Sequence, residues 1–199
     1  MFQRGLWTIG HWKNVPIRLH WSIPLGALFF SRFEFAPGFW LGFVLLILFH
    51  ELGHAALAKA RRLHIFEVQV HGLGGVCVHE SGTPYDNSIV AWGGVLAQAL
   101  FLVPAFVIGQ LGVVRSAFVA ELVWVFTETN LFLIALNLIP IEPFDGAKAW
   151  RLPKLWWQRR GRRRPSKKKT KPRPPSGTED PVALARKLAQ DALDDARRH

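Results

Sequence analysis

The segment His50-Glu51-Leu52-Gly53-His54 carries the residue types of a metal-dependent hydrolytic site. On an α-helix, residues i and i+4 lie on one face, so two imidazoles at this spacing can bind a single zinc ion. Glu51 projects at an adjacent angle, where its carboxylate can take a proton from a zinc-bound water. The pattern therefore predicts one zinc ion held by His50 and His54, with Glu51 as the general base.

The surroundings of this segment argue against a chance match. The apolar run 39–49 precedes it directly, so the three ionisable side chains lie in a helix that is otherwise fit for a membrane. Ionisable groups in such a helix are costly unless something binds them, and they mark functional sites. We therefore interpret the segment as an intramembrane metal site.

Two histidines and a water leave a tetrahedral zinc one protein ligand short. Acidic residues at a suitable depth occur in the segment 137–146, where two prolines end a helix and a glycine permits a sharp turn. Asp145 lies in this turn and is the best candidate for the third ligand. Glu142 is the competing candidate, and we interpret it as a charge at the cytosolic rim.

The elements that position these residues are suggested by an uneven distribution of charge. Half of the 199 residues are hydrophobic although the formal net charge is +11, and 13 of the 25 basic residues lie in residues 148–173. Such segregation is typical of a membrane domain with a basic tail on one side. The tail has no aromatic residue between positions 158 and 173, so no base-stacking surface is evident and we expect no nucleic-acid partner.

Four apolar stretches have about the length that crosses a bilayer. They are residues 17–35, which is the shortest, then 39–60, 88–110 and 116–139. Lysines and arginines cluster before the first stretch, after the second and after the fourth. By the positive-inside rule this predicts a multi-pass protein of the cell (inner) membrane with both termini in the cytosol. Its fold class is an all-α membrane protein with about four transmembrane helices.

The segment between the second and third apolar stretches has a different pattern. Residues 65–71 alternate in polarity, the alternation breaks at Gly72–Gly75, and it resumes at residues 76–78. We expect a small β-hairpin with strands at 66–70 and 76–78. His71 and His79 flank the turn; a second metal site is one interpretation, and ordinary surface histidines are the simpler one.

The sequence suggests three regions, namely a transmembrane domain over residues 1–150, a basic disordered linker over 151–178 and a short amphipathic helix over 179–199. The basic tail can bind anionic membrane lipid or act only as a topology anchor. The C-terminal helix either lies on a membrane or partner or is marginal and frayed. Cys77 is the only cysteine, which excludes an intrachain disulfide, and we interpret it as a small buried apolar residue.

The HExxH pattern inside an apolar helix, followed by Asn-x-x-Pro-x-x-x-x-Asp-Gly over residues 137–146, resembles the site-2 proteases, a family of zinc intramembrane metalloproteases. The resemblance extends to residues 74–76 and 93–98 and covers roughly residues 15–150. Gly94 departs from it, because many relatives have Gly-Pro there. The family implies a three-helix catalytic core with His50, His54 and Asp145 as zinc ligands and Glu51 as base.

The resemblance also implies regulated intramembrane proteolysis, in which zinc-activated water hydrolyses a peptide bond of a single-pass transmembrane protein. Asn137, Gly74 and Gly75 are then candidates for binding the substrate or oxyanion, although Asn137 can equally serve in helix packing. The strands of the hairpin can pair with an unwound substrate. The alternatives are a zinc transporter and a non-catalytic zinc-binding scaffold. The sequence assigns no role to His20 or Glu128 and leaves the oligomeric state open.

Overall fold

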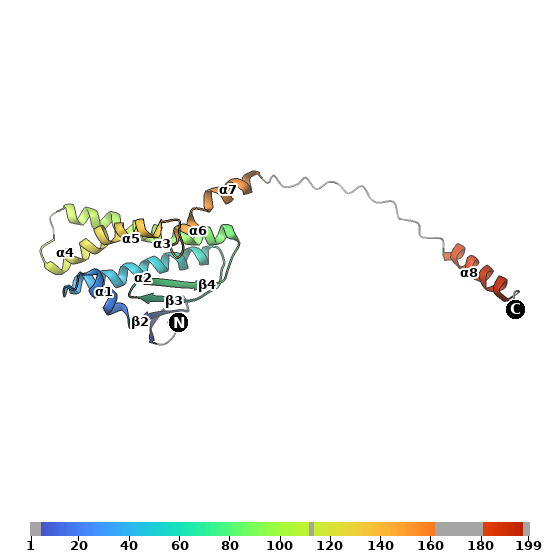
Figure 1. The fold of residues 1–199 in the computed structure, drawn as a ribbon, viewed down its shortest axis with the longest axis horizontal. Coiled ribbons are helices and arrows are strands. Elements are labelled where there is room, and N and C mark those ends of the chain that lie inside the picture. Colours follow the sequence, from blue (N-terminus) through green and yellow to red (C-terminus); the bar gives the residue numbers. More distant parts are fainter. Residues whose placement is uncertain (1–4, 112–113, 162–180, 197–199) are drawn as a thin grey trace. The chain divides into compact units, whose positions relative to one another are not determined.

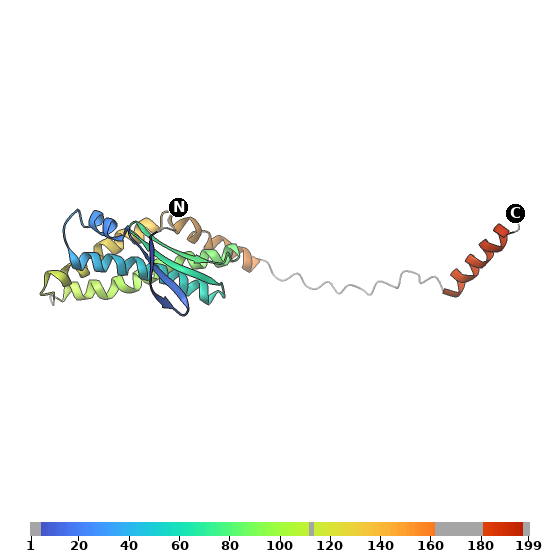
Figure 2. The same cartoon turned by 90° about the horizontal axis from the view of Figure 1, so that it is seen from below.

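A computed structural model of the chain describes residues 5–111, 114–161 and 181–196. The chain divides into two compact units, Met1–Arg160 and Gly161–His199, and each is described by itself. The first unit contains long helices that lie side by side and a small sheet on one side of them (Figures 1 and 2). The molecule is mostly helical, and its sheet is larger than the expected hairpin.

Three helical segments of the described residues are long and apolar enough to cross a membrane. They are α2 (Pro37–Ala60), α3 (Pro84–Gln110) and a third span, Ala117–Asn137. The third span consists of α4 (Ala117–Trp124), the π-helical turn η1 (Val125–Thr129) and α5 (Asn130–Asn137). Integral membrane character, as expected from the apolar stretches, follows from these three segments.

The first predicted span, residues 17–35, is not a continuous helix. Its beginning belongs to a strand, and the rest contains α1 (Ile23–Phe30), whose eight residues rise about 12 Å. That length is well short of the roughly 30 Å hydrocarbon core. The structure therefore has three helices of spanning length among its described residues, where the sequence predicted about four.

The sheet consists of two hairpins. The strands β1 (Leu6–Trp12), β2 (Val15–His20), β3 (Ile65–His71) and β4 (Gly74–His79) are ordered β1-β2-β3-β4. Each hairpin is antiparallel, and β2 pairs with β3 in parallel. The first hairpin was not predicted. Its two-residue turn places Lys13 and Asn14 at positive φ, which matches the twist of the paired strands.

Strand β2 and helix α1 together run in the direction opposite to α2. Val15, at the start of β2, packs in a cluster with Ala58 near the end of α2. Ala27 of α1 packs with Phe39 near the start of α2. A strand followed by a short helix thus extends along α2 where a fourth spanning helix was expected.

The start of α1 is fixed to the turn between β3 and β4. Ser22 Oγ lies 2.7 Å from Nδ1 of the buried His20 and accepts a hydrogen bond of 3.0 Å from the backbone N–H of Gly72. The backbone of Gly72 packs so closely on Gly26 that a Cβ on Gly26 would overlap it. These contacts give His20 a structural role, which the sequence did not assign.

Helices α2 and α3 contact each other through backbone atoms. A Cβ on Gly53 would overlap the carbonyl oxygen of Gly93, and a Cβ on Gly93 would overlap the carbonyl oxygen of Gly53. Small residues allow membrane helices to approach closely, because dispersion contacts rather than the hydrophobic effect hold such helices together. This contact lies within the HExxH segment and sets the distance between α3 and the two histidines.

The third span leads into two short helices, α6 (Gly146–Ala149) and α7 (Leu152–Gly161). Helix α7 occupies the first part of the expected linker 151–178; residues 162–180 lie outside the described part of the chain. In the second unit, α8 (Pro181–Ala196) occupies most of the region expected to form a C-terminal helix. The division into domains at residues 150 and 178 stays a prediction.

We expect Gly93→Ala to destabilise the protein, because its Cβ meets backbone atoms that cannot rotate away. Overpacking of this kind costs about 1–3 kcal/mol in the free energy of unfolding. The matched change Gly10→Ala introduces a Cβ with no neighbour within 4 Å and should cost less than about 0.5 kcal/mol. Thermal unfolding in detergent compares the two; equal midpoints would contradict the importance of the glycine contact.

Candidate metal centre

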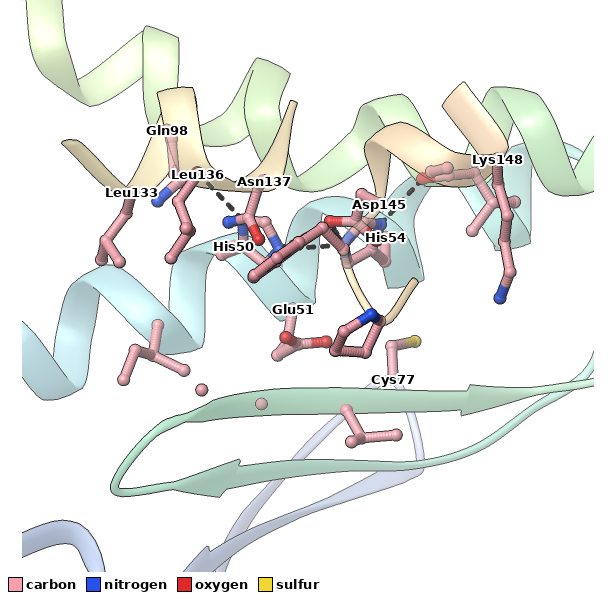
Figure 3. A pocket seen from close by; sticks show the side chains of 18 of the residues that line it. His50, Glu51, His54, Cys77, Gln98, Leu133, Leu136, Asn137, Asp145 and Lys148 are labelled. Atoms are coloured by element: carbon pink, nitrogen blue, oxygen red, sulfur yellow. Dashed lines mark hydrogen bonds and ion pairs between the residues drawn. The ribbon is translucent and has the colours of Figure 1, made fainter. Parts of the chain in front are cut away.

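Three atoms of the ligand type converge in the first unit from segments far apart in the sequence (Figure 3). Nε2 of His50 lies 3.0 Å from Nε2 of His54 and 3.0 Å from Oδ2 of Asp145. Nε2 of His54 lies 3.1 Å from the same Oδ2. Ligand atoms about 2.0–2.1 Å from a tetrahedral zinc lie about 3.3 Å from one another. The triangle is therefore close to the size that one zinc ion requires.

Helix α2 supplies two of the three atoms by its regular geometry. His50 and His54 are one turn apart on the same face, with ring centroids separated by 4.7 Å and ring planes at 82°. Both side chains are buried. The helix continues to Ala60, so His50 lies about 15 Å from its C-terminal end. The site is thus inside the apolar segment.

The third atom comes from a chain reversal after the third span. Residues 138–145 form irregular turns, and Gly146 packs against the backbone carbonyls of Leu138 and Ile139, where a Cβ would overlap them. The indole N–H of Trp150 donates a 2.7 Å hydrogen bond to the Leu138 carbonyl and closes the reversal. This folded segment directs Asp145 back toward α2, as its position between helix-breaking residues predicts.

Each histidine has a partner on α3 for its second ring nitrogen. Nδ1 of His54 lies 2.8 Å from the carbonyl oxygen of Val90, which can only accept a hydrogen bond, so this nitrogen carries the proton. Nδ1 of His50 lies 3.0 Å from Oε1 of the buried Gln98. Metal-binding histidines commonly donate their other N–H to such groups, which fixes the tautomer and the ring orientation.

The donor set fits a cation. With both Nδ1 atoms protonated, the neutral imidazoles present the lone pairs of Nε2 to each other and to Asp145. When a second proton lies on Nε2 of these rings, burial still disfavours ionisation of Asp145, but the hydrogen bonds and positive charge of His50 and His54 hold the pKa of this carboxyl well below its usual range. Three acceptor atoms this close repel one another unless a proton or a metal ion lies among them. The residues present therefore suit zinc, which prefers nitrogen and carboxylate ligands.

Glu51 lies beside this triangle and points from α2 toward β4 (Figure 3). Its carboxylate and the two imidazoles have ligand-type atoms that lie within 4.8 Å of one another. Gly75 of β4 packs directly against the side chain of Glu51, and a Cβ there would overlap it. Only a glycine at this position lets the strand approach the carboxylate this closely. The reason is the lack of space for a Cβ, because the φ of Gly75 is one that other residues can adopt.

A cavity of about 580 Å³ opens onto these residues. Asn137, Gly74 and Gly75, singled out from the sequence, line it together with the metal-type side chains. Cys77 and Lys148 line it as well; Lys148 lies one turn after Asp145 (Figure 3). Burial and the nearby Glu51 carboxylate raise the pKa of the Cys77 thiol to about 12, so at neutral pH the thiol keeps its proton.

The structure bears on two interpretations drawn from the sequence, one for Glu142 and one for His71 and His79. Glu142 is exposed and does not line the cavity, so Asp145 is the carboxylate next to the histidines. His71 pairs with Gly74 at the turn of the hairpin, whereas His79 pairs with Ile65 at its other end. The structure therefore separates His71 from His79 and does not form the second metal site. The ring of His71 instead lies 4.9 Å from that of His20, and burial together with His20 lowers the pKa of His71.

The sequence did not point to the support that α3 gives to His50. Oε1 of Gln98 lies within hydrogen-bond distance of Nδ1 of His50. Gly94 packs so closely on the same imidazole that a Cβ on Gly94 would overlap the ring. Gly94 and Gln98 lie one turn apart, a spacing that is visible in the sequence, but nothing in the sequence connects α3 to His50. The departure at Gly94 from the Gly-Pro of many relatives thus occurs at a position that contacts the site.

Comparison with curated proteins finds similar chains, although no protein-family model matches. The putative zinc metalloprotease Rip3 of Mycobacterium tuberculosis is 30% identical over 176 residues, covering 77% of this chain and 44% of Rip3. Stage IV sporulation protein FB of Bacillus subtilis is 33% identical over 108 residues, covering 53% of this chain and 36% of that protein. The chain thus spans less than half the length of these curated relatives.

Among solved structures, a site-2 protease from Methanocaldococcus jannaschii has a similar fold, with a TM-score of 0.58 and 21% sequence identity. The similarity covers 75% of this chain and 71% of that chain. Together with the curated relatives, this shared fold confirms the family resemblance drawn from the paired sequence motifs.

We expect Gln98→Leu to weaken zinc binding by about 10–100-fold, because His50 loses the partner that orients its ring. Competition with a fluorescent chelator measures this affinity without reference to activity. The control is Gln110→Leu, an exposed glutamine at the end of the same helix, which should bind zinc as the wild type does. Equal affinities in both variants would show that Gln98 does not support the centre.

Proposed function

We propose, on the premise of the site-2 protease family that the curated relatives and the shared fold support, that this chain is an intramembrane zinc metalloprotease. The observation that carries the proposal is the convergence of His50, His54 and Asp145 beside Glu51, at the depth of the apolar helices. The reaction is hydrolysis of a peptide bond in a transmembrane substrate.

In this proposal His50, His54 and Asp145 hold one zinc ion per chain. When bound, zinc supplies a Lewis acid that polarises the scissile carbonyl and makes a water molecule acidic enough to attack at neutral pH. The protein keeps the two histidine ligand atoms in place through Gln98 and the Val90 carbonyl, so little reorganisation of these rings is needed during the reaction.

Glu51 acts as the general base and then as the general acid. Its carboxylate takes a proton from the attacking water and returns it to the departing amine nitrogen. The close packing of Gly75 limits the positions that the Glu51 side chain can take. Asn137 lines the same cavity, where its amide can donate a hydrogen bond to the carbonyl oxygen of the substrate as negative charge develops there.

The free edge of β4 is where the substrate pairs. Strand β3 lies between β2 and β4, so its backbone N–H and C=O groups already form hydrogen bonds with these two strands. Residues 66–70, one of the two predicted strands of the hairpin, are therefore not free to pair with a substrate. Strand β4 is at the edge of the sheet, and Gly74, Gly75 and Cys77 line the cavity beside Glu51. An extended substrate segment added to β4 passes the site with its peptide bonds exposed.

The centre lies at the level of the apolar helices, which fits a transmembrane substrate, and the family resemblance implies that this substrate is a single-pass protein. A membrane helix hides its carbonyls in hydrogen bonds, so the segment to be cut must unwind before β4 can pair with it. Gly74 has open space where a Cβ would lie, which leaves room for a second backbone at the start of β4.

For the orientation, we propose that the end of α2, the end of the third span and both termini face the cytosol of a cell whose inner membrane holds the protein. Basic residues follow both helix ends, whereas Arg32 and Arg115 are the only ones in the opposite loops. Val15, which follows the turn between β1 and β2, packs in a cluster with Ala58, so this turn lies on the same side as the end of α2. The basic tail after residue 148 then faces anionic lipid.

We expect Glu51→Gln to bind one zinc ion per chain and to cleave a fluorescent model transmembrane substrate at least about 10³-fold more slowly than wild type, since it removes the proton acceptor. Metal analysis and cleavage in detergent test both parts. Removal of zinc with a chelator should abolish cleavage by the wild type, and added zinc should restore it. Zinc in both forms with cleavage in neither would favour the scaffold or transporter, and zinc uptake by vesicles would separate those two.

The lone cysteine allows a test of strand pairing. Cys77 lines the cavity on β4 and is the only cysteine in the chain. In the Glu51→Gln background, single cysteines are placed along a substrate around its cut site and oxidised with iodine. Pairing as a strand predicts disulfides at every second substrate position. A period of three to four positions would indicate a helical substrate. Cys77→Ser is the negative control, because this variant has no cysteine that can form the disulfide.

A further inference from the structure

The third span has an exposed face with an acidic residue in its middle. Glu128 is exposed, and the large apolar side chains one turn away on the same face, Trp124, Leu131 and Phe132, are each more than half exposed. Spacings of four, three and four residues place these side chains on one stripe of the helix. The span is the least covered of the three, with 11% of an 18-residue apolar stretch within it buried.

The depth of Glu128 leaves its carboxylate no route to water along the helix. It lies 11 residues after Ala117 and 9 before Asn137, so each end of the span is about 14–17 Å away. A glutamate side chain is far too short to reach either interface from there. A carboxylate exposed to hydrocarbon at mid-membrane is costly, and such residues mark a functional contact with a partner.

Glu121, the other acidic residue of this span, has hydrogen-bond partners for its carboxylate. Oε2 of Glu121 accepts hydrogen bonds of 2.7 and 3.2 Å from the backbone N–H groups of Gly38 and Phe39, and so caps the start of α2. Within the described residues Glu128 has no hydrogen bond or ion pair. It also lies in the π-helical turn Val125–Thr129, a local distortion that is frequent at functional sites.

This face is distinct from the candidate metal centre. The cavity is lined from this span by Leu133, Leu136 and Asn137, and Glu128 is not among its lining residues. At about 100° per residue, Asn137 lies roughly opposite Glu128 on the helix. A helix that docks on Glu128 therefore packs outside the cavity and leaves β4 free.

We propose that this face binds a transmembrane helix of another protein that carries a lysine or arginine at mid-membrane depth. A cation at this depth complements the carboxylate, and both charges are then removed from lipid together. A second copy of this chain has no such group to offer, because the three spans contain no arginine and only one lysine, Lys59, which lies at the end of α2. The inference requires that the protein spans the membrane, and it does not depend on the proposed proteolysis.

The test uses the full chain with Glu51→Gln, which prevents cleavage, in liposomes of neutral lipid. The probes are single-span peptides of leucine and alanine with a central lysine or, as the matched peptide, a central leucine. Energy transfer from the labelled chain to labelled peptide is measured against the peptide-to-lipid ratio. We expect the lysine peptide to associate about fivefold more tightly than the leucine peptide.

The preference should depend on Glu128 alone. Glu128→Leu should bind both peptides equally, and Glu128→Lys should prefer a peptide with a central glutamate. The matched control is Glu34→Leu, an exposed carboxylate in the loop before α2, which should keep the preference for lysine. Zinc content and the thermal unfolding midpoint verify that each variant is folded, and Glu128→Gln replaces Glu128→Leu should the latter fail to fold.

Equal association of the lysine and leucine peptides with the unsubstituted Glu128 chain would overturn the proposal, as would a preference for lysine that persists in Glu128→Leu or in Glu128→Gln. Transfer between two differently labelled copies of the chain that disappears in Glu128→Leu would also overturn it, because the partner would then be a second copy.

Discussion

The backbone contact between Gly53 and Gly93 determines how α3 meets the HExxH segment. It brings the two helix axes close enough for the Val90 carbonyl to reach His54 and for the Gln98 side chain to reach His50. Larger side chains at the contact would separate the helices, and both imidazoles would lose the acceptors that fix their tautomers. The metal-type triangle thus depends on a contact between residues that take no part in chemistry.

A sheet at the depth of apolar helices must satisfy its backbone groups internally, because lipid offers no hydrogen bonds. Each strand is hydrogen-bonded to its neighbours in the order β1-β2-β3-β4. The sheet packs along α2 through Val68 and Val70, which are fully buried. Among the described residues the outer edges of β1 and β4 are both unpaired, and the edge of β4 lies beside the cavity. An unpaired edge beside a water-accessible cavity is tolerable, whereas the same edge facing lipid would not be.

Polar side chains within the spans mostly bind the neighbouring helix. Glu121 caps the start of α2, and the side chain of Gln98 contacts Nδ1 of His50. The side-chain amide of Asn130 donates a 2.9 Å hydrogen bond to the backbone carbonyl of Gln98. The first unit is thereby connected from the third span through α3 to the metal-type residues of α2. Against this background Glu128 is distinctive, because its carboxylate has no such neighbour among the described residues.

Local patterns in the sequence predict the chemistry of the site and the apolar character of its helices. The spacing of His50 and His54 fixes their common face whatever surrounds the helix, and the prolines before Asp145 require a turn there. Apolar length predicted three spans to within a few residues at most ends. Contacts between elements far apart in the sequence account for the features of the fold and of the site that were not predicted. Residues 17–35 form a strand and a short helix because β2 gains a partner in β3, 51 residues away in sequence at each paired position. Likewise Gln98, Gly94 and His20 acquire their roles from packing between elements, and such long-range contacts leave no local pattern in the residues themselves.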